Sequence, residues 1–414
     1  MRRRLSWLLI VCLIIACVGC GKATQKNDKD IEGRQSNKET SENSFNEDKY
    51  DVQVEPHPSG CECCIPKVNE NDSDAKKIQL TIWVPSAEMN VIKSLCWRFD
   101  NAHTEYDFDF VYKEIDDTDI YSKISSGDTM DADIFYFTND QLSQLVESEY
   151  IMELSQEVYE RVEEKHDSRA VESCMVDEKL YAIPYTVEMM YLFYNKNLFT
   201  EEEVKNLDTM MVKDIMNCDY NFSMLMDDGW NVASYYVGGG CSMPEADGTF
   251  SSDWTTDRGV AIADYLDSLV SNSRFYKCEN VDDIIDLLAD GKCASICADY
   301  KNYKEIREAL GNNYEVCELP QFTYDYKGEK VTSNMASFGT YKSIGINKNT
   351  KYPAQVALLT EYLTGETAGD YRIKVYSATP TYKALIDVIR GDKYEDPVVR
   401  AGVNHMSKVI VKPT

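Results

Sequence analysis

Alternating strand-like and helix-like segments begin at about residue 78, and they constrain the fold more than any other feature of the sequence. Residues 78–83 form a β-rich run, and 88–100 carry apolar side chains at helical spacing. The alternation repeats, with strands predicted at 106–112 and 132–137 and helices at 116–126 and 141–149. This pattern is typical of an α/β sheet, whose ligands gather at the carboxyl ends of strands. The turns after Trp83 and Phe137 are therefore predicted to lie near a site.

The second half of the chain also contains predicted strands and helices, beginning with a long extended run at 179–194. Residue types alternate along this run as in a strand, and the run is continuous enough to pass from one domain to another. It is therefore predicted to be a hinge strand. Further strands are predicted at 294–298 and 338–346, and helices after Trp230 and at 257–270, 281–289 and 354–363. With 414 residues, the chain is too long for one ordinary domain, and two lobes are expected.

Charge excludes several classes of function. The chain has 43 basic and 71 acidic residues, a formal net charge of −28. Such a charge repels phosphate backbones, so no nucleic-acid partner is expected, and the ligand is expected to be neutral or cationic. Only four histidines are present, widely separated. We therefore expect no metal site, no cofactor and no serine–histidine–aspartate triad.

The N-terminus has the pattern of a secretion signal. A basic start at 2–4 precedes an apolar segment at 5–15 that is too short to span a membrane. Small residues then precede Cys17 and Cys20, which resembles the lipobox of bacterial lipoproteins. Cys20 leaves the longer apolar segment and is favoured for lipidation, whereas Cys17 has the cleaner upstream sequence. Acylation with more than one chain would anchor the protein stably on the outer face of the cell membrane.

Residues 20–75 are predicted to be a solvated tether, because charged and amide side chains dominate and no periodicity is present. A cluster of Cys61, Cys63 and Cys64 lies in this segment near His57, but its spacing is not that of a zinc site. The cysteines of the later segments are scattered among apolar residues. This placement favours small buried side chains over a disulfide framework.

The order of segments resembles that of the extracellular solute-binding proteins of ABC importers, in their carbohydrate, maltose-binding-like group. The resemblance covers most of residues 76–414. It is carried by the first strand ending Ile-Trp at 82–83, the run DADIFYFTND at 131–140, YAIPYTVE at 181–188 followed by YNKNL at 194–198, DGKCA at 290–294, and GIN at 345–347. It implies two α/β lobes, each a sheet flanked by helices, which are joined by a hinge and close on a ligand.

The resemblance also implies ligand-binding positions. An aromatic after the third strand matches Phe137, and an acidic residue three positions later matches Asp140. Further matches are Glu188 beside the crossing between lobes, Trp230 with Asn231 at the start of a helix, and Tyr300, aligned within a residue or two. A sugar site needs flat aromatic faces against C–H surfaces and carboxylate or amide groups for the hydroxyl edges. These residue types provide both.

The implied organisation is a signal peptide at 1–19, a tether at 20–75, an N-lobe at 76–186 and 335–385, and a C-lobe at 187–334 and 386–414. Family members continue beyond the segment that matches 398–414, so either the second lobe is smaller here or the reading frame is truncated. The implied partners are a carbohydrate and the permease subunits of an ABC transporter.

Three other functions remain open from the sequence. The same fold could report its ligand to a membrane sensor without transport, or bind a polyamine or a peptide. A glycosidase would need paired acids, which Asp131 with Asp133 and a group at 116–119 provide. These acids lie at strand and helix starts, where capping explains them, and no nucleophile, phosphate-loop or zinc-protease motif is present. We therefore expect a binding protein rather than an enzyme.

Overall fold

The computed structural model describes residues 76–127, 130–205, 207, 221–243, 253–391 and 394–411. The predicted signal, tether, lipidated cysteine (Cys20 or Cys17) and the cysteine cluster at 61–64 lie outside these ranges. Within them, none of the helices is long and apolar enough to cross a membrane.

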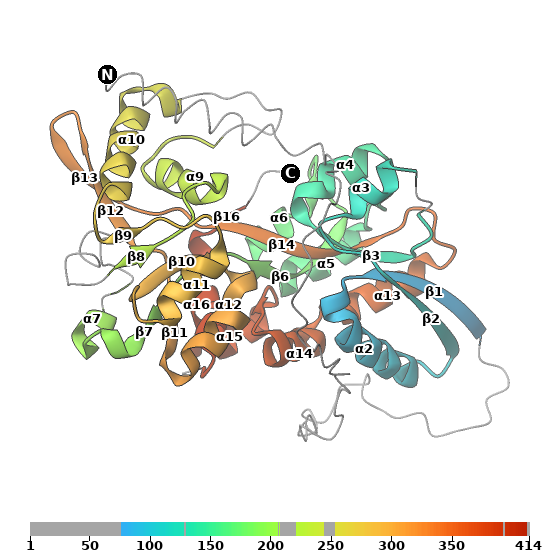
Figure 1. Cartoon of the computed structure of the whole chain (residues 1–414). Coiled ribbons are helices and arrows are strands. Elements are labelled where there is room, and N and C mark those ends of the chain that lie inside the picture. The colour runs from blue at the N-terminus through green and yellow to red at the C-terminus, as the bar shows by residue number, and fades with distance from the viewer. Residues whose placement is uncertain are drawn as a thin grey trace, which may run out of the picture. The chain divides into compact units, whose positions relative to one another are not determined.

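The first sheet has the order β15-β6-β14-β3-β1-β2, with β16 pairing at the start of β14 (Figure 1). Strands β1, β2 and β3 are parallel, and β14 runs antiparallel between β3 and β6. Its strands are β1 (Lys76–Val84), β2 (Tyr106–Glu114), β3 (Ile134–Thr138), β6 (Ala182–Glu188), β14 (Phe338–Ile346), β15 (Thr379–Pro380) and β16 (Ile410–Val411). The helices associated with these strands in the chain are α2 (Met89–Ala102), α3 (Ile120–Ser125), α4 (Leu142–Glu147), α5 (Gln156–Lys165), α6 (Ser168–Glu172), α13 (Pro353–Thr364) and α14 (Glu366–Tyr376).

The second sheet has the order β11-β7-β10-β8-β9. Its strands are β7 (Met190–Asn195), β8 (Phe222–Ser223), β9 (Phe275–Tyr276), β10 (Ser295–Asp299) and β11 (Tyr314–Cys317). The helices of this part are α7 (Glu201–Lys205), α9 (Gly229–Gly238), α10 (Asp257–Val270), α11 (Val281–Ala289), α12 (Tyr303–Leu310), α15 (Lys383–Gly391) and α16 (Pro397–His405). Two hairpins, β4–β5 (Met175–Val176 with Lys179–Leu180) and β12–β13 (Gln321–Tyr326 with Glu329–Asn334), form two-stranded sheets of their own.

Each sheet has its own apolar core. The first core joins β1 and β3 to α2 and α13, with Ile82, Phe135 and Leu359 among its fully buried members. The second joins β7 and β10 to α11, α15 and α16, with Phe193 and Ile296 among its fully buried members, and it also includes Val187 of β6 and Tyr341 of β14. The predicted α/β sheet pattern is confirmed, and the bounds of the predicted elements at 257–270, 281–289 and 338–346 match the structure.

One predicted helix begins later than expected. The helix expected at 116–126 starts only at Ile120, because Asp116 accepts hydrogen bonds from the backbone N–H and the hydroxyl of Thr118. This local turn competes with helix formation, as short acidic side chains commonly do. The following residue, Asp117, is buried and contributes to the polar cluster described below.

The chain passes between the two sheets at several points. Only Met189 separates the end of β6 from the start of β7. A second passage joins β13 to β14 through residues 335–337, and α9 packs directly on it. A Cβ at Gly238 would lie 2.1 Å from the Asn334 carbonyl oxygen and 2.8 Å from the Ala336 nitrogen. Ala336 also donates its N–H to the Ser234 carbonyl at 2.8 Å. No side chain larger than hydrogen therefore fits between this helix and this passage.

A buried histidine lies near a third passage, from β15 into α15. The Nδ1 of His166 is 3.0 Å from the Thr381 hydroxyl, and its ring meets Tyr382 edge-on with centroids 5.3 Å apart. Burial is the main reason that the pKa of His166 is lowered to about 3, and the positive charges of Lys165 and Lys383 add to the effect.

Acid is expected to destabilise the fold through this histidine. The unfolded chain takes up the proton near pH 6.5, whereas the folded chain resists it down to about pH 3. The free energy of unfolding that depends on a neutral His166 is thus fully present above pH 6.5. It is lost as the pH falls, and the loss is about 2 kcal/mol at pH 5. His166→Gln should remove this part of the pH dependence in urea unfolding at pH 5 to 7. An unchanged dependence in the variant would contradict the assignment.

Five of the seven cysteines in the described ranges are buried. Burial raises the pKa of Cys96 and of Cys174 to about 12, so both stay protonated near neutral pH. For these residues the prediction of small buried side chains is confirmed, and we infer that they serve packing rather than redox chemistry.

Candidate functional site

A cavity of about 220 Å³ opens at the carboxyl ends of β8 and β10 and the start of α9. Met190, the first residue of β7, and Phe338, the first residue of β14, also line it. The cavity therefore lies where the chain passes between the sheets, at the kind of strand-end position at which α/β proteins hold ligands.

The start of α9 is fixed by its own capping residue. The Oδ1 of Asp228 accepts hydrogen bonds from the backbone N–H groups of Trp230 at 2.8 Å and Asn231 at 3.1 Å. Asn231 donates its amide to the Leu225 carbonyl at 2.9 Å, which ties the helix to the chain after β8. The two residues that the sequence pairs at this helix start therefore line the cavity together from a well-anchored position.

Trp230 supplies an accessible aromatic surface. The residue is 40 % exposed, which is unusual for tryptophan, and its ring lies 5.1 Å from that of Phe338 at an angle of 57°. Both residues line the cavity. An exposed indole beside a second ring is suited to stacking against the apolar face of a ligand.

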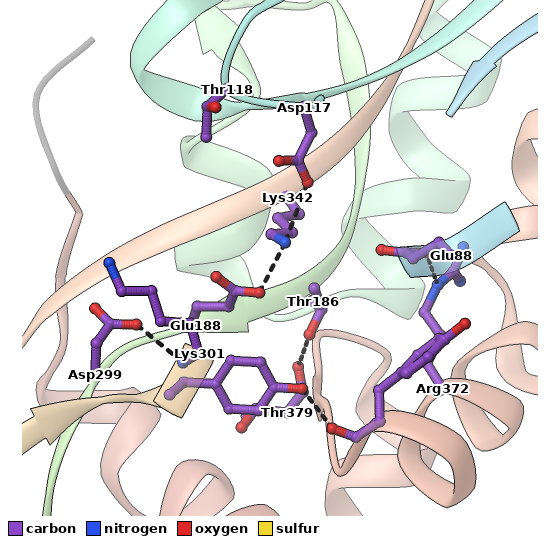
Figure 2. A network of polar contacts seen from close by, with 12 residues as sticks. Glu88, Asp117, Thr118, Thr186, Glu188, Asp299, Lys301, Lys342, Arg372 and Thr379 are labelled. Atoms are coloured by element: carbon purple, nitrogen blue, oxygen red, sulfur yellow. Dashed lines mark hydrogen bonds and ion pairs between the residues drawn. The ribbon is translucent and has the colours of Figure 1, made fainter. Parts of the chain in front are cut away.

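A charged cluster of Asp117, Glu188 and Lys342 lies near Asp299 and Lys301, two residues that line this cavity (Figure 2). The Nζ of Lys342 is 2.8 Å from the Glu188 Oε1 and 3.1 Å from the Asp117 Oδ2. The Glu188 and Lys342 side chains are each 19 % exposed and Asp117 is 6 % exposed. The cluster thus joins the loop after β2, the end of β6 and the middle of β14.

The charges in this cluster alter each other's titration. Burial raises the pKa of both Asp117 and Glu188, and the ammonium of Lys342 opposes that shift. Burial alone would lower the pKa of Lys342, but the carboxylates of Glu188 and Asp117 outweigh it and raise the pKa. Lys342 is therefore a permanent cation near neutral pH, held by two acids.

Asp299 and Lys301 add polar groups to the rim of the cavity. Asp299 accepts a hydrogen bond from the Lys301 backbone N–H at 3.2 Å, as the cap of the turn that follows β10. Figure 2 shows both residues beside Glu188, on the side away from Asp117. Carboxylate and ammonium groups of the two sheets thus border the same region.

A second buried ion pair, between Arg372 and Glu88, lies near this charged cluster (Figure 2). The Nε of Arg372 is 3.0 Å from the Glu88 Oε2, and the Glu88 Oε1 accepts the Tyr185 hydroxyl at 2.9 Å. Arg372 also donates to the Leu363 carbonyl at 2.6 Å, and its guanidinium lies 4.2 Å from the centre of the Tyr185 ring. Glu88, in the loop after β1, is therefore engaged in packing α14 against the first sheet.

The structure gathers only some of the predicted site residues. Trp230 and Asn231 line the cavity, and Glu188 lies beside it. Tyr300 is buried, stacks on Tyr303 with centroids 5.1 Å apart, and donates its hydroxyl to the Tyr376 carbonyl at 2.5 Å. It is not among the residues that line the cavity. In this conformation the Tyr300 ring is buried against other residues of the fold and presents no face to the cavity.

Phe137 and Asp140 are also placed away from the cavity. Phe137 is fully buried in the first core, because every residue of β3 is covered. Asp140 is exposed in the turn after β3, and it does not cap α4 through its side chain. Their ligand roles remain predictions, which this conformation does not bring together with Trp230.

The acids considered for a glycosidase have structural partners. Asp133 accepts the Thr81 N–H at 2.8 Å and the Thr350 hydroxyl at 2.6 Å, and Asp131 accepts the Trp83 indole N–H at 3.0 Å. The described residues contain no group of three or more His, Cys, Asp or Glu side chains placed to hold a metal ion.

Comparison with known proteins identifies the family. A family model described as bacterial extracellular solute-binding protein matches residues 97–398. The chain belongs to this family of bacterial extracellular solute-binding proteins. Its fold is the two-domain, maltose-binding-protein-like α/β fold that the resemblance implied.

Individual relatives of this solute-binding protein include the galactooligosaccharide-binding protein of Bacillus subtilis (strain 168). It is 26 % identical over 345 residues, which cover 78 % of this chain and 77 % of the relative. A solved structure with acarbose is 25 % identical, with a TM-score of 0.69 over 81 % of this chain and 88 % of the other. The maltodextrin-binding protein of L. casei BL23, solved without ligand, gives a TM-score of 0.70 at 18 % identity and similar coverage.

Proposed function

We propose that this solute-binding protein captures a neutral oligosaccharide between two lobes and delivers it to an ABC permease. The exposed Trp230 beside Phe338, in a cavity that Asn231 and Asp299 also line, carries the proposal, and Glu188 lies near Asp299. A sugar ring presents apolar C–H faces and hydroxyl edges, which this pairing of surfaces complements. The named ligands of the relatives are also carbohydrates.

The size of the cavity supports an oligosaccharide that binds in parts. At about 220 Å³, it is smaller than the roughly 300–1,000 Å³ of pockets that enclose drug-sized ligands. It therefore accommodates about one ring, and further rings would extend over the charged cluster toward the first sheet.

In this arrangement the lobes comprise residues 76–186 with 335–385 and 187–334 with 386–414, and the chain acts by binding, without catalysis. Acylated Cys20, or Cys17, would anchor it to the outer face of the membrane.

A thermal-shift screen tests the function directly. At a ligand concentration 100 times Kd, the gain is about 2.7 kcal/mol, which corresponds to several degrees in Tm. We expect galactooligosaccharides or maltodextrins to raise Tm, with isothermal titration confirming a saturable site. If no neutral sugar shifts Tm while spermidine or a peptide mixture does, the proposal is wrong. Release of reducing sugar during the titration would contradict a purely binding role.

A further inference from the structure

Lys342 occupies an unusual place for a charged side chain. It lies in the middle of β14, a strand paired on both sides, opposite Thr138 of β3 and Thr186 of β6. The rest of β14 is largely apolar or small, and most of its residues are buried. A lysine here loses most of its hydration, for which its contacts with Asp117 and Glu188 compensate.

Stability alone gives little reason for this arrangement. Buried ion pairs commonly contribute no more to stability than apolar side chains of the same volume. The cluster also keeps an excess of negative charge, because two carboxylates share one ammonium. Glu88, Asp116 and Asp299 act electrostatically on members of the same cluster, and of these Glu88 is paired by Arg372. An unfilled position between Asp117 and Glu188 would therefore attract a cation.

We infer that Lys342 is a specificity-determining residue of the proposed sugar site, because it fills with the protein's own ammonium the position that a ligand amine would occupy. Glu188 keeps a carboxylate oxygen that can accept a hydroxyl hydrogen, so neutral sugars still bind. Amino sugars and polyamines meet a position that is already filled. This inference rests on the proposed function and names the ligand class as neutral rather than cationic.

The decisive experiment compares neutral and cationic probes on Lys342→Met. Isothermal titration at pH 7 would use galactotriose and maltotetraose as neutral probes, and the β-1,4 glucosamine disaccharide and spermidine as cationic probes. We expect the variant to bind the neutral sugar about 10-fold more weakly, because Glu188 loses its anchor, and the cationic probes at least 10-fold more tightly. The preference for neutral over cationic ligands should fall by about 100-fold, which corresponds to about 2.7 kcal/mol.

Two matched variants separate charge from structure. Lys342→Arg keeps the cation and should keep the preference for neutral ligands. Lys342→Met combined with Glu188→Gln returns the cluster to a single excess negative charge, so the gain in cation binding should disappear. If Lys342→Met does not fold, Lys342→Gln, which can hydrogen-bond both carboxylates, replaces it with the same expected direction.

The outcomes are distinguishable from failure of the proposed function. If the wild type binds neither neutral sugar, the proposed function fails, while spermidine still reports whether the variant gains cation binding. An equal loss of affinity for all probes, with the preference unchanged, would show that Lys342 is only structural and would overturn the inference. Wild-type binding of spermidine as tight as that of the variant would overturn it as well.

Discussion

Replacing Arg372 with methionine is expected to lower the free energy of unfolding by about 3–5 kcal/mol. The guanidinium is almost completely buried, and it pairs with Glu88 while donating to the Leu363 carbonyl. Its removal leaves the Glu88 carboxylate inside the protein with only the Tyr185 hydroxyl as a described hydrogen-bond partner. An unpaired buried charge is the costly result, rather than the loss of the pair itself. Urea unfolding followed by circular dichroism measures the effect.

A double variant provides the control for Arg372. Adding Glu88→Gln to Arg372→Met removes the stranded charge, so the double variant should recover a large part of the lost stability. The Tyr185 hydroxyl can donate to the glutamine carbonyl as it does to Glu88. If the double variant is less stable than Arg372→Met, the explanation by an unpaired carboxylate is wrong.

Replacing Trp230 with alanine is expected to weaken sugar binding by about 100-fold, or 2–3 kcal/mol, as for aromatic side chains that dominate a binding surface. Trp230 is 40 % exposed, so the change should cost the fold little compared with its cost to the ligand. Isothermal titration with the sugar found in the thermal-shift screen measures the affinity, and urea unfolding measures stability.

The neighbouring tryptophan Trp254 serves as a matched control. It stacks on Tyr236 at 4.4 Å and packs against the small apolar cluster of Ala233, Ala336 and Phe338, but it is not among the residues that line the cavity. Trp254→Ala should therefore destabilise the protein while leaving most of the sugar affinity intact. Similar losses of affinity in both variants would argue against Trp230 as the stacking surface.

Local periodicity predicted several of the elements but not their partners. The strand at 338–346 matches the structure because apolar residues dominate it, and the lone lysine within it is a visible exception. The partners of that lysine could not be found in the same way. They depend on β14 lying between β3 and β6, and strand order is a property of the whole sheet.

The same limit explains the aromatic positions. Phe137 ends an apolar run that could equally have one or both faces covered, and the fold covers both. Tyr300 follows a strand end as the family pattern requires, yet its hydroxyl is bound to Tyr376, whose position in the fold depends on a distant helix. Trp230 and Asn231 were found because the family pattern places an aromatic residue at the start of this helix, which Asp228 caps in the structure.

The close packing of α9 at Gly238 has a mechanical consequence. The helix that begins with the Trp230 region rests with its other end on the backbone that leads to Phe338, with no side chain between them to deform. Trp230 and Phe338, whose rings line the cavity, are therefore linked through the close contact between α9 and the chain that leads into β14. Because Phe338 begins β14 of the first sheet, this contact fixes the stacking surface to the first sheet as well as to α9.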